Sequence, residues 1–199
     1  MRIKQGARVK SRRLGGWVAI AALALAVGVI VALVLVGNFQ DRVQRGIYPL
    51  EHEQVIRSAS EEYDMEPALV AAIIHTESGF DPQAESDQNA YGLMQIVPST
   101  AGYVSRQSQI PGNFREPETN IRLGVWYLEY LEERYAGSER LMLASYNAGE
   151  GTVDTWLQDE SFDISQDIPY PETASYVEDV RETRDTYADL YGTNLNREA

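Results

Sequence analysis

The longest apolar segment of the chain runs from Leu14 to Val36 and contains no charged residue. At the rise of an α-helix these residues span roughly 35 Å, which is enough to cross the hydrocarbon core of a bilayer. A cleaved signal peptide is the alternative, but its apolar region is normally about 7–15 residues long and is followed by small residues. This run is longer, and Val34-Leu35-Val36 lacks the small-residue pattern. The sequence therefore predicts an uncleaved membrane anchor over residues 14–36.

Charge near the anchor predicts its orientation. Six basic residues and no acidic residue precede it: Arg2, Lys4, Arg8, Lys10, Arg12 and Arg13. Basic flanks stay in the cytoplasm, so residues 1–13 are predicted to be a cytoplasmic tail and everything after the anchor to lie outside the cell membrane. Residues 37–50 are then a linker, and residues 51–191 the outer domain.

Beyond the linker, apolar residues recur at the spacing of helix faces. The pattern predicts helices over residues 51–63, 67–78, 98–106, 117–135, 139–147, 152–157 and 174–190. Residues 117–135 are expected to form the longest helix of this domain, and residues 192–199 a flexible, frayed tail. No convincing pair of strands appears, so the predicted fold class is all-α.

The helix predicted from residue 67 ends in a candidate catalytic acid. Pro67 suits the first helical position, and residues 68–74 are all apolar. Glu77 then follows at the end of this apolar face. A carboxyl held against apolar surface is desolvated, so its pKa rises and it can donate a proton near neutral pH. An ordinary exposed Glu near a helix end is the alternative.

The residues after Glu77 form an ordered series that carries a family resemblance. The matching residues are Glu77-Ser78, Phe80-Asp81-Pro82, Ala84, Ser86, Ala90, Gly92-Leu93-Met94-Gln95, Pro98, Thr100, Ala101, Asn120-Ile121, Gly124, Tyr127-Leu128, Tyr146-Asn147-Ala148-Gly149, Glu172-Thr173 and Tyr176-Val177. This series resembles the lytic transglycosylases of the soluble-enzyme (SLT) type, a branch of the lysozyme-like superfamily, over about residues 51–185. One departure is Asn89, where the family usually has Gly. Asn tolerates a left-handed backbone, so the turn is expected to survive.

The resemblance implies a lysozyme-like domain that acts on peptidoglycan strands without a cofactor. Glu77 would protonate the oxygen between N-acetylmuramic acid and N-acetylglucosamine. The same Glu would then accept a proton from the muramic C6 hydroxyl, which closes a 1,6-anhydro ring. Ser86 and Gln95 would bind the sugar or its acetamido group, and Met94 would shape the groove. Ser86 could instead be a plain turn residue.

Three later residues have both a functional and a structural interpretation. By resemblance, Tyr146 and Asn147 orient the acid and line the sugar groove, although Asn-Ala-Gly is also a plausible helix stop. The hydroxyl of Tyr176 would point at the catalytic site, or Tyr176 would be a core tyrosine. Gly124 is expected to allow close helix packing.

Two other functions remain open. A hydrolase of the goose-lysozyme kind would share Glu77 and activate water with Asp81 or Asp87 held across the groove, because glycoside hydrolysis usually needs two carboxyl groups. A membrane-tethered glycan-binding module would keep the aromatic groove and show no turnover.

Composition excludes several classes of site. The chain contains no cysteine, which excludes disulfides, thiolate metal sites and an N-terminal lipidated Cys. It has two His residues, and His75 lies two positions from Glu77 and therefore on another helix face, so no metal site is predicted. After residue 13, 11 basic residues face all 30 acidic ones, a balance of −19. Such an acidic domain is not expected to bind nucleic acid.

Overall fold

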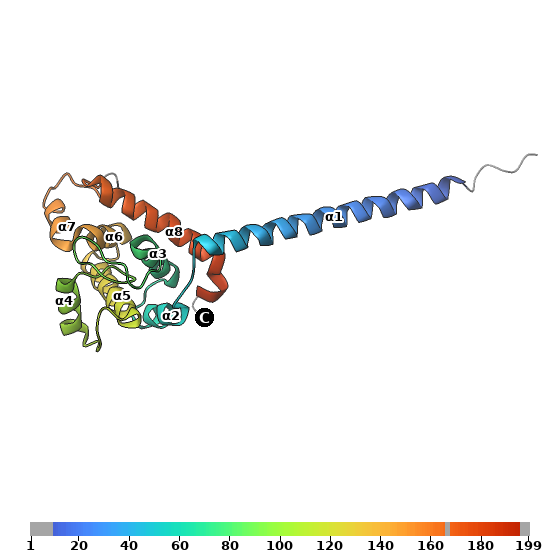
Figure 1. The fold of residues 1–199 in the computed structure, drawn as a ribbon. Coiled ribbons are helices and arrows are strands. Elements are labelled where there is room, and N and C mark those ends of the chain that lie inside the picture. Colours follow the sequence, from blue (N-terminus) through green and yellow to red (C-terminus); the bar gives the residue numbers. More distant parts are fainter. Residues whose placement is uncertain (1–9, 166–167, 196–199) are drawn as a thin grey trace, which may run out of the picture. The chain divides into compact units, whose positions relative to one another are not determined.

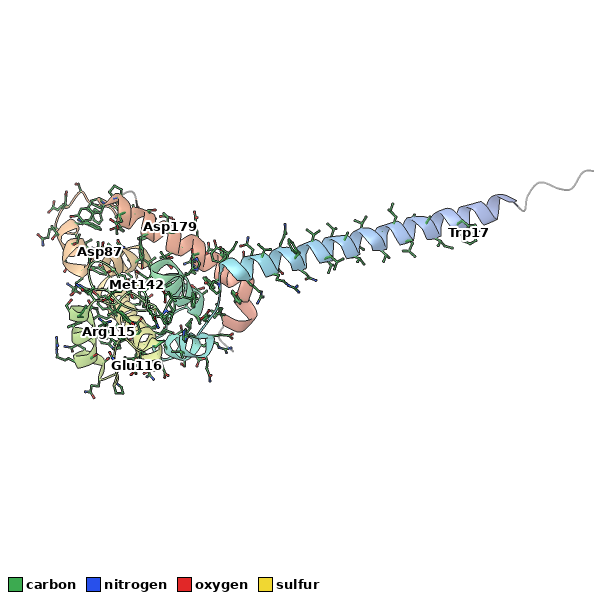
Figure 2. The ribbon with its side chains drawn as sticks, viewed as in Figure 1. Trp17, Asp87, Arg115, Glu116, Met142 and Asp179 are labelled. Atoms are coloured by element: carbon green, nitrogen blue, oxygen red, sulfur yellow. The ribbon has the colours of Figure 1, made fainter. Side chains whose placement is uncertain are left out.

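The computed structural model describes residues 10–165 and 168–195 (Figure 1). The chain divides into two units, residues 1–47 and residues 48–199. In Figure 2, Trp17 projects from the helix of the first unit, and Met142 belongs to the buried core of the second.

The first unit is a single helix, α1 (Lys10–Ile47). Within it, residues 20–47 form one helix that is long and apolar enough to cross a membrane, with a mean hydropathy of 3.0 in its most apolar window. The helix continues through residues 37–47, which were predicted to be a linker. It ends at Ile47, two residues before Pro49, and a proline disfavours helical backbone in the residue before it. The predicted cytoplasmic tail lies mostly outside the described residues.

The second unit contains seven helices in its described part. They are α2 (Glu53–Glu62), α3 (Pro67–Ser78), α4 (Pro98–Ser108), α5 (Pro117–Arg134), α6 (Glu139–Ala148), α7 (Glu150–Trp156) and α8 (Pro171–Leu195). Proline occupies the first turn of α3, α4 and α5, where no backbone donor is needed. Only isolated β-bridges, Glu85 with Tyr91 and Tyr91 with Ile96, occur in the described residues. The predicted all-α class is confirmed.

The last helix is longer than predicted. α8 has 25 residues and α5 has 18, so α8 and not α5 is the longest helix of this unit. It begins at Pro171, and its last residue, Leu195, is 3% exposed. Burial of Tyr187, Tyr191 and Leu195 holds the helical backbone through a stretch predicted to fray. Residues 196–199 of the predicted tail lie outside the described part of the chain.

Helix α3 lies at the centre of the core. Residues 67–74 are all buried, and α3 packs most extensively against α8 (Figure 1). Gly79 ends α3 in a left-handed conformation with φ +60°, which glycine adopts without steric strain because it has no Cβ. The helix therefore stops at Ser78, which leaves Glu77 at the rim of the core.

The short segment after residue 47 is held against this core. The hydroxyl of Tyr187 donates to the carbonyl of Pro49 at 2.7 Å, and that of Tyr191 donates to the carbonyl of Tyr48 at 2.8 Å. The ring of Tyr48 lies 5.0 Å from that of His75, centroid to centroid. His75 is thus a packing residue, and burial lowers its pKa.

Candidate active site

A cavity of about 600 Å³ opens beside the C-terminal end of α3. Its lining comes from α3, the loop of residues 81–97, the start of α4, α5, the end of α6 and the start of α8. The lining residues include Glu77, Ser86, Gln95, Thr100, Tyr127, Tyr146, Asn147, Tyr170, Glu172 and Thr173. Five of the seven residues predicted to form the site, Glu77 among them, line this cavity, which is built from parts of the chain that are distant in sequence.

The chemistry of this cavity centres on Glu77. Burial raises the pKa of its carboxyl to about 7, against the opposing effect of a hydrogen bond from Tyr176. A group with this pKa holds a proton in about half of the molecules at neutral pH. It can therefore donate a proton and take one back within a single reaction cycle.

Tyr176 orients the acid. Its hydroxyl donates to Oε1 of Glu77 at 2.7 Å, and its ring is buried, with 8% of the residue exposed. Burial, together with the negative charge of Glu77, raises the pKa of Tyr176 well above 10, so the hydroxyl stays a donor. The two residues stand 99 positions apart in the sequence, and the packing of α8 on α3 brings them together.

Removal of the Tyr176 hydroxyl is expected to shift the pKa of Glu77 while the Glu77 carboxyl stays in place. In Tyr176→Phe the carboxylate form of Glu77 loses its hydrogen bond, so the pKa of Glu77 should rise further. Turnover should fall by roughly tenfold, within the usual range for one orienting contact, and the pH profile of kcat should move to higher pH. Tyr63→Phe, which loses a hydroxyl bonded to Glu62 away from the cavity, is the matched control. If the pH profile of kcat does not move, the Tyr176 hydroxyl does not influence the pKa of Glu77.

Ser86 and Gln95 line the cavity while they also build its loop. Oγ of Ser86 accepts from the backbone amide of Ala90 at 3.1 Å, as a turn residue does. Nε2 of Gln95 donates to the carbonyls of Ala84 and Gly92, at 3.0 and 2.9 Å. The structural and the functional interpretations of Ser86 are therefore compatible.

Tyr146 and Asn147 come from the end of α6. The hydroxyl of Tyr146 donates to the carbonyl of Met94 at 2.8 Å, and Oδ1 of Asn147 accepts from the hydroxyl of Thr173 at 2.8 Å. Both residues line the cavity. Each ties one wall of the cavity to another, while the hydrogen bond to Glu77 comes from Tyr176.

Met94 lies differently from the expectation. Its side chain is completely buried beneath the cavity and packs against Gly124, where an added Cβ would overlap the Met94 sulfur. The side chain therefore cannot touch a ligand in this conformation. Its contribution to groove shape is indirect, through the carbonyl that binds Tyr146.

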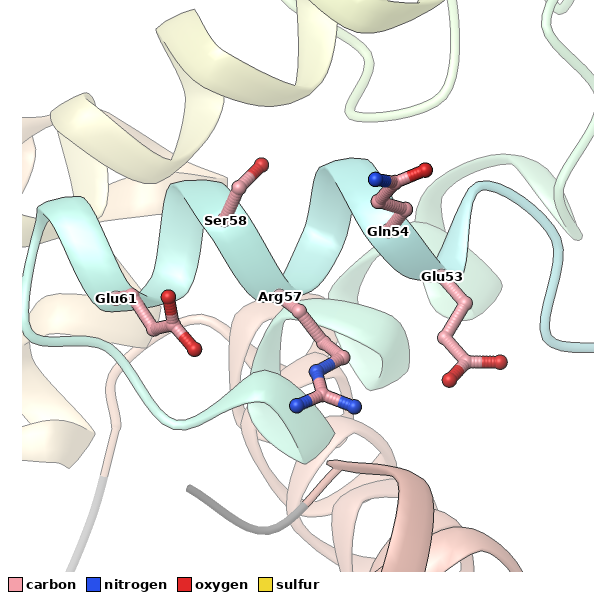
Figure 3. A pocket seen from close by; sticks show the side chains of 5 residues that line it. All are labelled: Glu53, Gln54, Arg57, Ser58 and Glu61. Atoms are coloured by element: carbon pink, nitrogen blue, oxygen red, sulfur yellow. The ribbon is translucent and has the colours of Figure 1, made fainter. Parts of the chain in front are cut away.

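A second hollow, on the outward face of α2, brings no such groups together (Figure 3). Its lining residues are Glu53, Gln54, Arg57, Ser58 and Glu61, all from one helix. Among the described residues, no group of three or more His, Asp or Glu side chains is arranged to hold a metal ion.

Comparison with known proteins decides the family. The model of the transglycosylase SLT domain matches residues 54–168. The chain belongs to the SLT transglycosylase domain family. The match begins in α2 and ends just before α8, so Tyr176 lies beyond the matched stretch.

Relatives and solved structures agree with this assignment. The soluble lytic murein transglycosylase of Salmonella typhimurium is 33% identical over 156 residues, which are 73% of this chain and 24% of the relative. The membrane-bound lytic murein transglycosylase C of Serratia proteamaculans is 36% identical over 138 residues, 62% of this chain and 37% of the relative. The matched part of this chain thus spans about a quarter of the first relative and somewhat more than a third of the second.

Two solved structures share the fold of the SLT domain. The 70 kDa soluble lytic transglycosylase of Escherichia coli matches with a TM-score of 0.70 and 29% identity, over 78% of this chain and 28% of that one. The lytic transglycosylase Slt of Pseudomonas aeruginosa, solved as an inactive Glu-to-Gln mutant, matches with a TM-score of 0.68 and 31% identity, over 75% of this chain and 25% of that one. The predicted lysozyme-like transglycosylase fold is confirmed.

The SLT domain contains a structural residue that sequence reasoning did not place in the site. Asn120 is completely buried in α5. Its Oδ1 accepts from the amide of Met94 at 2.8 Å, and its Nδ2 donates to the carbonyls of Tyr91 and Phe114 at 2.9 Å. The sequence signal was present, because Asn120 belongs to the family series, but nothing in the sequence says which loop it holds.

The loop that Asn120 holds has several left-handed residues. Asn89 has φ +61°, as its tolerance for that backbone predicted, and Gln95 has φ +44°. Gly92, at φ +81°, lies against the Asn120 side chain, where an added Cβ would come within 2.8 Å of Nδ2. Gly is needed here both for the backbone and for this close approach.

Proposed function

We propose that this SLT domain cleaves the β-1,4 bond between N-acetylmuramic acid and N-acetylglucosamine in peptidoglycan and leaves 1,6-anhydromuramic acid ends. The observation that carries the proposal is Glu77, whose pKa burial raises to about 7 at the wall of an open cavity. The names of the relatives, soluble and membrane-bound lytic murein transglycosylases, support the substrate class. A structure of a 70 kDa soluble lytic transglycosylase in complex with bulgecin A supports ligand binding by this type of domain.

Glu77 would act in two proton transfers. In the first, its protonated carboxyl gives a proton to the bridging oxygen as the bond to the muramic C1 breaks. In the second, the carboxylate takes the proton of the muramic C6 hydroxyl as that oxygen bonds to C1, so no water is consumed. The hydrogen bond from Tyr176 stabilises the carboxylate between the two steps.

The competing hydrolytic route needs a second carboxylate that activates water. Asp81 and Asp87, the sequence candidates, are absent from the lining of this cavity, whereas Glu172 is present there. Glu172 is exposed and lies in the first turn of α8. If water were the nucleophile, Glu172 would be the base that this structure offers.

The products distinguish the two routes. We expect purified cell-wall sacculi to yield muropeptides that are one water lighter than lysozyme products and that borohydride cannot reduce. Heavy oxygen from labelled water should not enter C1, and Glu172→Gln should keep most of the activity. Reducible, labelled ends as the main product, together with loss of turnover in Glu172→Gln, would assign the domain to the hydrolases.

We also propose that α1 anchors the domain in the cell membrane, with the basic flank in the cytoplasm. One long apolar helix in the described residues and membrane-bound relatives support this.

The full-length chain is expected to sediment with membranes and to resist extraction by high salt. A chain that begins at Tyr48 should be soluble and active. A chain that begins at Glu51 should melt at lower temperature, because it lacks the two carbonyls that Tyr187 and Tyr191 bind. Release of a shortened form into the medium would contradict the anchor.

A further inference from the structure

The aromatic floor of the cavity continues beyond it. Tyr127 of α5 lines the cavity, and its ring lies 6.0 Å from that of Tyr130, one turn further along the helix, with an interplanar angle of 16°. Tyr130 in turn lies 5.9 Å from Trp126, and these two rings are parallel within 3°. Tyr103 of α4 meets Tyr130 edge-on at 5.7 Å and Trp126 at 6.5 Å. We call Tyr103, Trp126 and Tyr130 the aromatic strip.

The strip adjoins the cavity along α4 and α5, and the start of α7 borders it on a third side. On α4, Thr100 lines the cavity and Tyr103 lies three residues on, on the same helix face. On α5, Tyr127 and Tyr130 have the same relation. On the third side, Gly149 lines the cavity and Glu150, the next residue, accepts a hydrogen bond from the Tyr130 hydroxyl at 3.1 Å.

The strip differs from a packed aromatic core in exposure and in polarity. All three residues are partly exposed, whereas core aromatics such as Trp156 and Tyr187 are buried. Glu150 supplies a half-exposed carboxylate beside the rings. Arg134, the nearby cation, is paired with Glu150 and Asp154.

These groups fit a chain of uncharged sugar rings. Sugar rings present C–H groups on their flat faces, which pack on the electron-rich faces of aromatic rings. Their hydroxyls donate to carboxylates and tyrosine oxygens at the rim. Because the strip is continuous with the cavity, the ligand that best fits it is a further part of the strand bound there.

We infer that the aromatic strip is an additional binding site for sugar units of the glycan strand, beyond those held at Glu77. The inference rests on the proposed function for the identity of the strand. It assigns Trp126, Tyr130 and Tyr103 to binding of long strands, and leaves the bond-cleaving step to Glu77.

The test uses the full-length protein in detergent, with Glu77→Gln to prevent turnover. The probes are β-1,4-linked N-acetylglucosamine disaccharide and hexasaccharide, and calorimetry gives Kd for each. Trp126→Leu keeps apolar bulk and loses the aromatic face, whereas Trp126→Phe keeps an aromatic face. The hexasaccharide should bind about tenfold more weakly to the Trp126→Leu protein, with the disaccharide unchanged and Trp126→Phe close to the parent.

The outcomes separate this inference from the proposed function. If hexasaccharide and disaccharide keep their ratio of Kd values in Trp126→Leu, the strip does not bind sugar. If Trp126→Leu does not fold, the same ratio of Kd values is measured for Tyr103→Leu, which removes the aromatic ring of the strip on α4. If the protein with intact Glu77 yields no anhydro ends, the proposed reaction is wrong. If the hexasaccharide still loses affinity relative to the disaccharide in Trp126→Leu, the inference that the aromatic strip binds sugar is kept.

Discussion

Glu77→Gln is expected to lower turnover of peptidoglycan by at least about 10²–10⁴-fold, the usual contribution of a single general acid. The amide keeps the size of the side chain and can still accept from the Tyr176 hydroxyl, but it has no proton to give and cannot act as the base in the second step. The loss should therefore appear in kcat, with binding of the strand little changed. Release of soluble muropeptides from sacculi measures it.

The same variant has an expected effect on stability that shows whether the acid is buried as described. The folded protein raises the pKa of Glu77 from 4.5 to about 7, so between these values it binds more protons than the unfolded chain. The stability of the wild type then falls as pH rises through this window, and it levels off above the folded-state pKa. Gln does not titrate, so it removes this penalty.

Glu77→Gln should therefore be more stable than the wild type at about pH 8, by up to about 3 kcal/mol, and should show no such gain at about pH 4. Urea unfolding at both pH values measures the difference. Glu172→Gln, a substitution of the exposed carboxyl in the same cavity, is the matched control and should show a much smaller change. Near-normal turnover in a folded Glu77→Gln protein would remove Glu77 from the mechanism.

The sequence predicted the helices best where local signals and burial agree. Pro67, Pro98 and Pro117 fix helix starts, and the apolar residues after each of them are buried. At α8 the signals disagree, because acidic and tyrosine residues make its last turns look polar. Those turns are stabilised by the burial of Tyr187 and Tyr191 against parts of the chain about 140 residues away in sequence, with separations of 138 and 143. Periodicity in one segment cannot reveal such partners.

The site was predictable in the same uneven way. The raised pKa of Glu77 followed from the apolar helix before it, because desolvation is a consequence of local pattern. The contact of Tyr176 with Glu77 depends on how α8 packs on α3, and only the family resemblance pointed to it. Met94 shows the opposite case, because a residue of the family series lies under the cavity and not at its surface. A motif says that a residue matters, but packing decides what it touches.

Substitution of Asn120 is expected to have a large effect on stability. It is completely buried, and its side chain satisfies three backbone groups, from Met94, Tyr91 and Phe114. In Asn120→Leu the volume is similar, but all three groups lose their partner in a place that water reaches poorly. Each unpaired buried group costs about 1–3 kcal/mol, so the free energy of unfolding should fall by roughly 3 kcal/mol or more.

Two matched variants make the Asn120 experiment decisive. Asn120→Asp keeps an oxygen for the Met94 amide, but near neutral pH its buried carboxylate would face the carbonyls of Tyr91 and Phe114, so its cost should be at least as large as that of Asn120→Leu. Asn113→Leu makes the same change of residue type at an exposed turn and should cost less than about 1 kcal/mol. Urea unfolding ranks the three proteins, and sacculus cleavage reports on the loop that carries Gln95. Equal stability of Asn120→Leu and the wild type would mean that the loop holds its shape without these bonds, and that the left-handed backbone at Asn89 and Gly92 is sufficient to position the cavity wall.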